Sequence, residues 1–328
     1  MHLHLLLTES PQAEARELSS PAATALTLDA LIRLAPGTVQ MLSRGAAIGG
    51  ERPNALPWQW FRAPSEAGTA AYTALADDLP VGNGYWLRVD PVHLSARRDD
   101  LSVHAVTRLS HDEASEYLRA INTVLKLDGL EAVHTVPDRW YLRLPVPPDL
   151  TTTALSAMND LPMGAGLPQG ADAGSWLRRM TELQMVLHTH PVNVSREARG
   201  DLPVNGVWPW GGGCLPSVPL EAVGAVYGTD PLLRGLARHA GGEAHPVPAG
   251  MAHLAPSPRA LVQFDGALDL AMLEDRWMSP IRQALRRGAL AACEITFKRL
   301  AQSFHVSRSH LWRFWRTPSV DLLRFFEV

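Results

Sequence analysis

Cysteine is scarce in this chain, and so are long apolar runs. Only Cys214 and Cys293 occur among 328 residues, far apart and outside any CxxC spacing. The sequence therefore argues against a disulfide scaffold and against a thiolate zinc site. No uninterrupted apolar stretch approaches the roughly 20 residues of a transmembrane helix, so we expect no membrane partner. The short apolar run at 3–7 has no basic segment before it, and we interpret it as a buried strand of a cytoplasmic protein rather than as a signal peptide.

Catalytic signature motifs are missing as well. The chain contains no G-x-S-x-G, no H-E-x-x-H and no phosphate-binding G-x-x-x-x-G-K-[ST], and the three glycines at 211–213 lack the spacing of a dinucleotide-binding turn. His188 and His190 have no neighbouring Cys or Asp, and His239 and His245 flank only Glu243. We therefore assign no catalytic residue and no metal ligand, and we expect no cofactor.

The charge that is present is unevenly distributed. The formal net charge is -3, yet Arg276 to Val328 holds ten Lys/Arg against three Asp/Glu, a local balance of +7. A basic segment of this kind can bind nucleic acid or an acidic partner, or it can form a solvated arginine-rich face. We favour the solvated face and do not expect nucleic-acid binding; the sequence identifies no protein partner.

Hydrophobic periodicity divides the chain into alternating elements. Residues 3–7 predict a strand and 23–35 a helix that stops at Pro36 and Gly37, while 44–70 is predicted to be mainly loop. Strands are expected at 84–96, 102–110, 130–136 and 139–146, with a helix over 110–129 whose start is a capping box of Ser110 and Glu113. The apolar stripe of that helix consists of Ala114, Tyr117, Leu118, Ile121 and Leu125.

From Ala173 onward helices and strands alternate again. The simplest organisation is an α/β core domain, formed by residues 1–75 and 151–328, with an inserted α+β domain at 76–150.

Two segments carry a resemblance to a known family. One is the block at 84–145. The other, at 188–213, contains His190-Pro191, Asn193, Arg196, Pro203, Asn205, Trp208, Trp210, Gly211 and Gly213. Together with a weaker match at "LTLDALIRLA", they resemble the archaeal-type cofactor-independent phosphoglycerate mutases of the alkaline phosphatase superfamily, and in particular a degenerate bacterial branch labelled RpfE-type regulatory protein. The resemblance implies an alkaline phosphatase-like three-layer core carrying a small inserted α+β domain.

The residues that this family uses for chemistry are replaced here. Glu9 stands where an Asp-Gly pair is expected, no Gly-Ser pair occurs at 40–65, Asp265 and Asp269 lack a following histidine, and Asp-His occurs nowhere. A two-metal phosphoryl transfer needs several such ligands together. We therefore predict a non-catalytic relative with a binding or regulatory role. One alternative is an active mutase or phosphatase that holds Mn or Zn with a different ligand set, and another is a DNA-associated regulator that uses the basic C-terminal segment.

The segment at 188–213 is the candidate ligand site, and we see almost no helical or strand periodicity in it. Its anion-binding candidates are Asn193, Arg196, Arg199, Asn205, Trp210, Gly211, Gly212 and Gly213. Arginines clamp phosphate or carboxylate groups, and glycines let backbone N–H groups approach an anion, so we expect a small phosphorylated or carboxylated metabolite. The other interpretation is structural: the arginines pair with core carboxylates, the asparagines fix turns, and the tryptophans anchor the segment. Arg88, Arg139 and Arg143 either add positive potential or lie on a sheet surface.

Residues 299–316 allow two structures. The spacing of Ala301, Val306, Ser307 and Leu311 suits a helix-turn-helix with a recognition helix at 307–315. The alternation of Phe304 and Val306 suits instead a pair of closing strands, which we favour.

Overall fold

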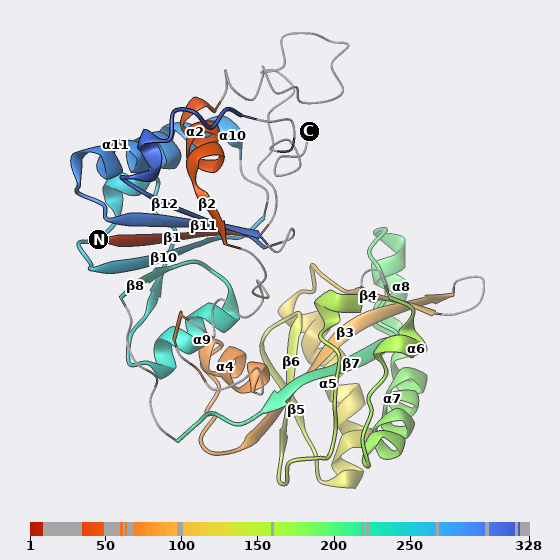
Figure 1. Cartoon of the computed structure of the whole chain (residues 1–328). Coiled ribbons are helices and arrows are strands. Elements are labelled where there is room, and N and C mark those ends of the chain that lie inside the picture. The colour runs from red at the N-terminus through yellow and green to blue at the C-terminus, as the bar shows by residue number, and fades with distance from the viewer. Residues whose placement is uncertain are drawn as a thin grey trace, which may run out of the picture. The chain divides into compact units, whose positions relative to one another are not determined.

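Two sheets organise the chain, one in each of two units (Figure 1). The computed structural model describes residues 1–8, 35–48, 60–61, 63, 68–96, 101–158, 161–217, 220, 224–266, 269–298, 302–318 and 321. Unit 1 consists of Met1–Ala63 and Leu220–Val328, and unit 2 of Pro64–Pro219.

The sheet of unit 1 is mixed but mostly parallel. Its order is β2-β12-β11-β1-β10-β8-β9. The strands are β1 (His2–Leu7), β2 (Ala46–Ile48), β8 (Ala225–Tyr227), β9 (Ala244–His245), β10 (Arg259–Phe264), β11 (Ala292–Phe297) and β12 (Gln302–Ser307). The central strand β1 is parallel to both β10 and β11, whereas β12 pairs antiparallel with β11 and with β2. Strand β1 is therefore enclosed on both edges, which explains its apolar sequence.

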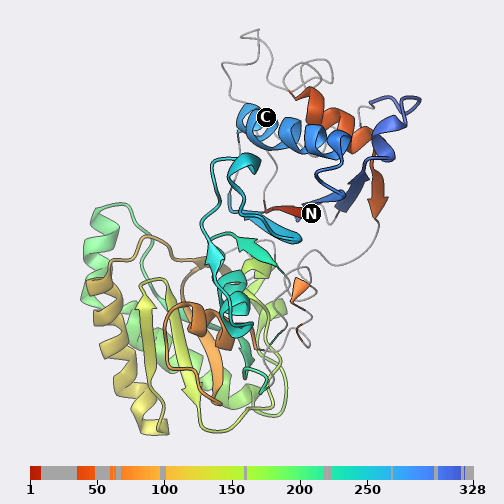
Figure 2. The same ribbon diagram turned by 90° about the vertical axis from the view of Figure 1, so that its left-hand side faces the viewer.

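Helices cover both faces of this sheet (Figures 1 and 2). Leu3, Leu5 and Leu7 point to the face covered by α2 (Pro36–Arg44), α10 (Leu270–Leu273) and α11 (Ser279–Arg287). A π-helical turn at Glu274–Met278 joins α10 to α11. Helix α9 (Pro231–His239) lies on the opposite face. Among the described residues no helix combines the length and apolar character needed to cross a membrane.

Unit 2 is built on an antiparallel sheet around one long strand. One edge of strand β3 (Tyr85–Ala96) pairs with β4 (Leu101–Ala105) and with β6 (Arg139–Leu144). The other edge pairs with β7 (Gly206–Gly213). Strand β5 (Ala132–Val136) extends the sheet beyond β6. Helices α5 (His111–Leu125) and α7 (Ala173–His188) pack on the face that carries Leu87 and Val89. Helix α4 (Thr69–Ala76) packs on the face of Trp86 and Tyr141. Helix α8 (Pro191–Ala198) and short turns at Leu155–Met158 and Met163–Gly166 complete the unit.

Most predicted elements are confirmed. The strand at 3–7 is β1, and the four predicted strands at 84–146 are β3 to β6. Helix α5 begins at the predicted capping box, in which Ser110 and Glu113 exchange hydrogen bonds, and its five predicted apolar residues are all buried. The predicted helix at 23–35 falls almost entirely outside the described residues.

One prediction is wrong: the segment at 188–213 is not irregular, since it contains α8 and β7. Two others fall largely on residues outside the described ranges. Pro36, the predicted end of the helix at 23–35, begins helix α2, because proline fits the first turn of a helix, where no backbone N–H donor is needed. Within 44–70, predicted to be mainly loop, the described residues include β2 and the start of α4. At 299–316 the favoured interpretation is confirmed: β12 pairs with β11, and the described part of this segment, 302–316, contains a strand and a 3-10 turn rather than a helix-turn-helix.

The unit boundaries lie outside those expected for the inserted domain. The expected segment, 76–150, lies within unit 2, which also includes the residues out to 64 and 219. The reason is that β7 supplies a strand next to β3, and that α7 covers the same face of the sheet as α5.

Candidate functional site

Asn193, in the predicted ligand segment, is buried and fully engaged with protein groups. Its side-chain oxygen accepts hydrogen bonds from the Tyr117 hydroxyl at 2.5 Å and from the Val204 N–H at 2.9 Å. Its amide group donates to the carbonyls of Leu187 and Val204. Asn193 thus ties α8 to the residues that lead into β7.

Arg196 and Arg199 converge on one carboxylate. Arg196, only 1% exposed, donates to Glu113 Oε2 at 3.0 Å and also to three backbone carbonyls. Arg199 donates to Glu113 Oε1 at 2.5 Å and to Asp201 at 3.3 Å. Burial acts to raise the pKa of Glu113, but hydrogen bonds from the Ser110 N–H and Arg199, together with the charge of Arg196, lower it. Two of the predicted anion clamps therefore hold a carboxylate of the protein itself.

The predicted residues on β7 contact β3 and α4. Trp210 Nε1 donates to Asp90 at 2.7 Å. Gly211 has a φ of +68°, which L side chains rarely adopt, and a side chain at Gly212 would collide with the Tyr85 hydroxyl. Gly213 lies opposite Trp86. Before β7, Asn205 bonds to both the N–H and the carbonyl of Leu94. The structure thus brings Arg196 close to Arg199, but Asn205, Trp210 and the glycines serve the pairing of the segment with β3. Anion binding by this set stays a prediction.

A buried ion pair occupies the centre of unit 2. Arg88 forms two hydrogen bonds to Asp90, at 2.8 and 2.7 Å, and its guanidinium lies over the rings of Tyr141 and Trp210, at 5.3 and 5.0 Å from the ring centroids. Burial raises the pKa of Asp90, while the charge of Arg88 opposes the rise.

The two other arginines of this block have separate positions. Arg139 forms two hydrogen bonds to Asp77, which also accepts the Tyr141 hydroxyl. Arg143 lines a surface cavity. Arg88 and Arg139 therefore neutralise buried acids rather than adding free positive potential.

The carboxyl ends of the parallel strands in unit 1 are where ligands of open α/β sheets usually bind. Asp265 follows β10 and accepts hydrogen bonds from the Thr229 hydroxyl at 2.6 Å and from the Gln263 amide at 2.9 Å. Asp230 accepts from the same Gln263 amide and from two N–H groups at the start of α9. Asp269 caps α10 through the N–H of Met272. Asp230 and Asp265 thus have protein partners on both carboxylate oxygens, whereas Oδ2 of Asp269 is buried without a hydrogen-bond partner among the described residues.

Within the ranges that the structure describes, no three His, Cys, Asp or Glu side chains are grouped so that they could hold a metal ion. The described donor set therefore does not fit a two-metal centre, which requires several such ligands around each ion. Glu9, the candidate at the end of β1, lies outside the described residues.

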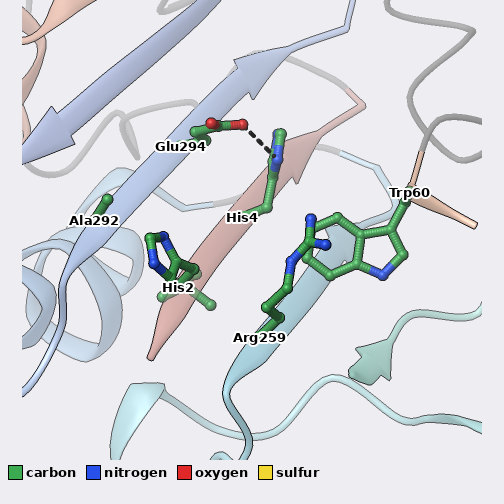
Figure 3. A pocket seen from close by; sticks show the side chains of 7 residues that line it. His2, His4, Trp60, Arg259, Ala292 and Glu294 are labelled. Carbon is green, nitrogen blue, oxygen red and sulfur yellow. Dashed lines mark ion pairs between the residues drawn. The ribbon is translucent and has the colours of Figure 1, made fainter. Parts of the chain in front are cut away.

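A different site lies at the amino ends of the central strands (Figure 3). We call it the His4 pocket; it is a cavity of about 290 Å³ lined by His2, Leu3, His4, Trp60, Arg259, Ala292 and Glu294. His2 and His4 project from β1, Arg259 is the first residue of β10, and Ala292 and Glu294 come from β11. The parallel register places His2 beside both Arg259 and Ala292.

A chain of polar contacts runs along one wall of the His4 pocket. Glu294 pairs with His4 Nδ1 at 3.0 Å, and the other nitrogen of His4 lies 2.9 Å from the Thr296 hydroxyl, which in turn lies 2.7 Å from the Ser303 hydroxyl. The hydrogen bond with His4 lowers the pKa of Glu294 to about 2. The imidazole is thereby held in one orientation, and the carboxylate is ionised at neutral pH.

The opposite wall of the pocket carries an arginine on an aromatic ring. The Arg259 guanidinium lies 4.4 Å from the ring centroid of Trp60, which is 7% exposed (Figure 3). Among the described residues no carboxylate pairs with Arg259. No sequence pattern considered above predicts this pocket. The "HLH" at residues 2–4 was its one visible signal, because alternate residues of a strand share a face, but the partners on β10 and β11 follow more than 250 residues later.

The two sheets define an α/β protein with a mixed, mostly parallel sheet and a separate antiparallel sheet. No family model matches the chain. By sequence it is distantly homologous to archaeal-type 2,3-bisphosphoglycerate-independent phosphoglycerate mutases. It is 30% identical over 184 residues to that of Methanothrix thermoacetophila, covering 53% of this chain and 46% of the relative, and 30% identical over 171 residues to one of Methanothermobacter thermautotrophicus, covering 48% and 41%. The chain therefore matches less than half the length of these relatives.

Two solved structures also align with the chain. A cofactor-independent phosphoglycerate mutase of Thermoplasma acidophilum aligns over 93% of this chain and 89% of its own, with 17% identity and a TM-score of 0.44. A protein of Pyrococcus horikoshii aligns over 92% and 84%, with 15% identity and a TM-score of 0.45.

Proposed function

We propose that this chain is a phosphoglycerate mutase-like binding protein that holds a small phosphorylated or carboxylated metabolite in the His4 pocket and does not carry out two-metal phosphoryl transfer. In this proposal unit 1 is a shortened alkaline phosphatase-like three-layer core, and ligand binding serves a regulatory role. The observation that carries the proposal concerns Asp230 and Asp265 at the carboxyl edge of the parallel strands. Both are hydrogen-bonded within the protein, and among the described residues no third metal ligand stands beside them.

Two-metal phosphoryl transfer requires several carboxylates and histidines that converge on the metal ions. At the carboxyl edge, Asp230 and Asp265 share the amide of Gln263, and each accepts a further hydrogen bond, from α9 or from Thr229. Among the described residues no third ligand stands beside them.

The His4 pocket has the chemistry of an anion site. Its Arg259 guanidinium has no described carboxylate partner, and Trp60 holds it in place by stacking, so little conformational entropy is lost when it binds an anion. His2 lies beside it in the parallel register and can donate a further hydrogen bond. The volume of about 290 Å³ is close to the lower limit of ligand pockets, roughly 300 Å³, which suits a metabolite of a few carbon atoms.

Calorimetric titration with 3-phosphoglycerate and with inorganic phosphate tests the binding proposal. Arg259→Gln should weaken binding about tenfold or more, since it removes the arginine of the pocket, which has no carboxylate partner among the described residues. Arg276→Gln is the matched control. It removes the same charge from a cavity lined by Thr229 and Asp265 at the carboxyl edge, and it should leave the affinity unchanged.

The catalytic half of the proposal is tested separately. Metal analysis of the purified protein, joined to a mutase assay with added Mn²⁺ or Zn²⁺, should show neither two bound ions nor turnover. Binding that is lost in Arg276→Gln but kept in Arg259→Gln would contradict the assignment of the pocket. Turnover that depends on two bound ions would contradict the claim that the chain is not a mutase.

A further inference from the structure

The arginine-rich C-terminal segment forms a second pocket in unit 1. Helices α2 and α11 lie side by side (Figure 1), and a 3-10 turn at His310–Trp312 packs against α2. At this place lies a cavity of about 490 Å³, which we call the Arg308 pocket. It is lined by Arg44, Arg286, Arg308, Leu311, Trp312 and Phe314.

The three arginines of this pocket have no described acidic partner. Arg44 donates to the carbonyl of Leu311 at 2.7 Å, and Arg286 donates to the side-chain oxygen of Gln40 at 3.2 Å. Neither bond neutralises the guanidinium. Arg44 and Arg286 lie in the last turns of α2 and α11, where the helix dipole favours positive charge. This placement allows like charges to gather without a carboxylate between them.

The positive potential extends beyond the lining of the pocket. Arg313 and Arg316 follow the 3-10 turn, and Arg316 donates to the carbonyl of Gly45. Burial lowers the pKa of His310, and the charges of Arg313, His305 and Arg316 lower it further. Nine of the ten basic residues from Arg276 to Val328 are arginine, the side chain that grips phosphate with a two-pronged fork and stacks on planar rings.

Large aromatic side chains stand exposed at the same place. Trp312, Phe314 and Trp315 are 69%, 76% and 67% exposed, and the rings of Phe314 and Trp315 meet edge to face at 5.4 Å. Exposed aromatic rings interleaved with arginines form the usual platform for nucleic-acid bases, because a base stacks on a ring while its phosphate meets a guanidinium.

We propose that the Arg308 pocket binds a nucleotide unit, in which a planar base stacks on Trp312 or Phe314 and the phosphate is held by Arg44, Arg286 and Arg308. A cavity of about 490 Å³ lies within the range of small-ligand sites. The aromatic residues sit on a three-residue turn and the chain after it, and not along the apolar face of a long helix as in proteins that lie on membranes. Nucleotide is therefore favoured over an anionic lipid surface. The bound nucleotide can be a free nucleotide or part of a single-stranded nucleic acid.

The test is a titration of the full chain, followed by Trp fluorescence and calorimetry. The probes are adenosine monophosphate, adenosine, inorganic phosphate, a single-stranded oligo-dA and vesicles containing an anionic phospholipid. The variants are Arg308→Gln and Trp312→Ala. Arg287→Gln is the matched control: it removes an equal charge from an exposed arginine of α11 that does not line the cavity. All three positions are exposed, so unfolding midpoints should match the wild type.

We expect adenosine monophosphate to bind at least tenfold more tightly than adenosine or phosphate alone. Arg308→Gln and Trp312→Ala should each weaken binding about tenfold, whereas Arg287→Gln should change it less than twofold. Equal affinity for the monophosphate and for oligo-dA, per site, identifies a free nucleotide as the source, and much tighter binding of oligo-dA identifies a strand; either result supports the pocket.

Three results would overturn the proposal. The first is an equal effect of Arg287→Gln and Arg308→Gln, which would indicate unspecific charge attraction. The second is phosphate binding with no added affinity from the base. The third is binding of anionic vesicles without binding of any nucleotide. The Arg308 pocket shares no lining residue with the His4 pocket, so failure here leaves the function proposed above untouched.

Discussion

Replacing Asp90 by alanine should destabilise unit 2 strongly. Asp90 holds Arg88 through two hydrogen bonds and Trp210 through a third, and the side chains of Arg88 and Asp90 are 7% and 4% exposed. Removing one partner of such a buried pair costs about 3–5 kcal/mol, because the other charge stays buried and unpaired. The rings of Tyr141 and Trp210 still face the guanidinium and recover part of this cost, about 0.5–2 kcal/mol. We therefore expect a loss of about 3 kcal/mol.

The assay is urea unfolding followed by circular dichroism, combined with hydrogen exchange of the β3 and β7 amides, which reports on unit 2 alone. Two further variants serve as controls. Glu116→Ala removes an exposed pair with Arg119 and should cost at most about 1 kcal/mol. The double variant Arg88→Met/Asp90→Leu removes both buried charges and should recover most of the stability lost in Asp90→Ala. A loss below about 1 kcal/mol in Asp90→Ala, or no recovery in the double variant, would refute the reasoning.

Two further predictions concern charges elsewhere. Arg196→Ala should cost about 3 kcal/mol in urea unfolding, because it leaves three backbone carbonyls and Glu113 without a buried donor; Arg199→Ala should have a much smaller effect, and equal effects would contradict the structural role of Arg196. The second concerns pH. The pKa of Glu294 is lowered to about 2 in the folded chain, so its ion pair with His4 stabilises the fold above about pH 4.5, and this contribution is lost as the pH falls toward 2. Because the Glu294 side chain is 41% exposed, the contribution is on the order of 1 kcal/mol. The difference in unfolding free energy between the wild type and Glu294→Gln should shrink over this pH range, and a difference independent of pH would rule this out.

Local patterns in the sequence predict much of the fold. The helix of unit 2 could be predicted down to its capping box, because Ser110 and Glu113 act within one turn and the apolar stripe repeats at helical spacing. Strand β12 could be predicted from the alternation of Phe304 and Val306. In each case the residues that determine the element are neighbours in sequence.

The segment at 188–213 shows where local patterns fail. Strand β7 has the sequence "GVWPWGGG", which reads as a loop because Pro and Gly are rare in strands. It is a strand because β3 lies beside it, and Gly211 and Gly212 accommodate the close approach of α4 and Tyr85. The same holds for Arg196, whose partners on and before α5 lie more than 80 residues earlier. The composition of such a segment therefore does not distinguish a binding motif from a packing motif. The partners of its residues in the fold make that distinction.

The most direct test of the central claim is a ³¹P NMR spectrum of 3-phosphoglycerate recorded over time with the protein and Zn²⁺. We predict that the phosphate resonance is perturbed by the wild type, that Arg259→Gln abolishes the perturbation while Arg276→Gln preserves it, and that the resonance of the isomeric phosphoglycerate never grows. Growth of that second resonance at a rate proportional to protein concentration would contradict the account.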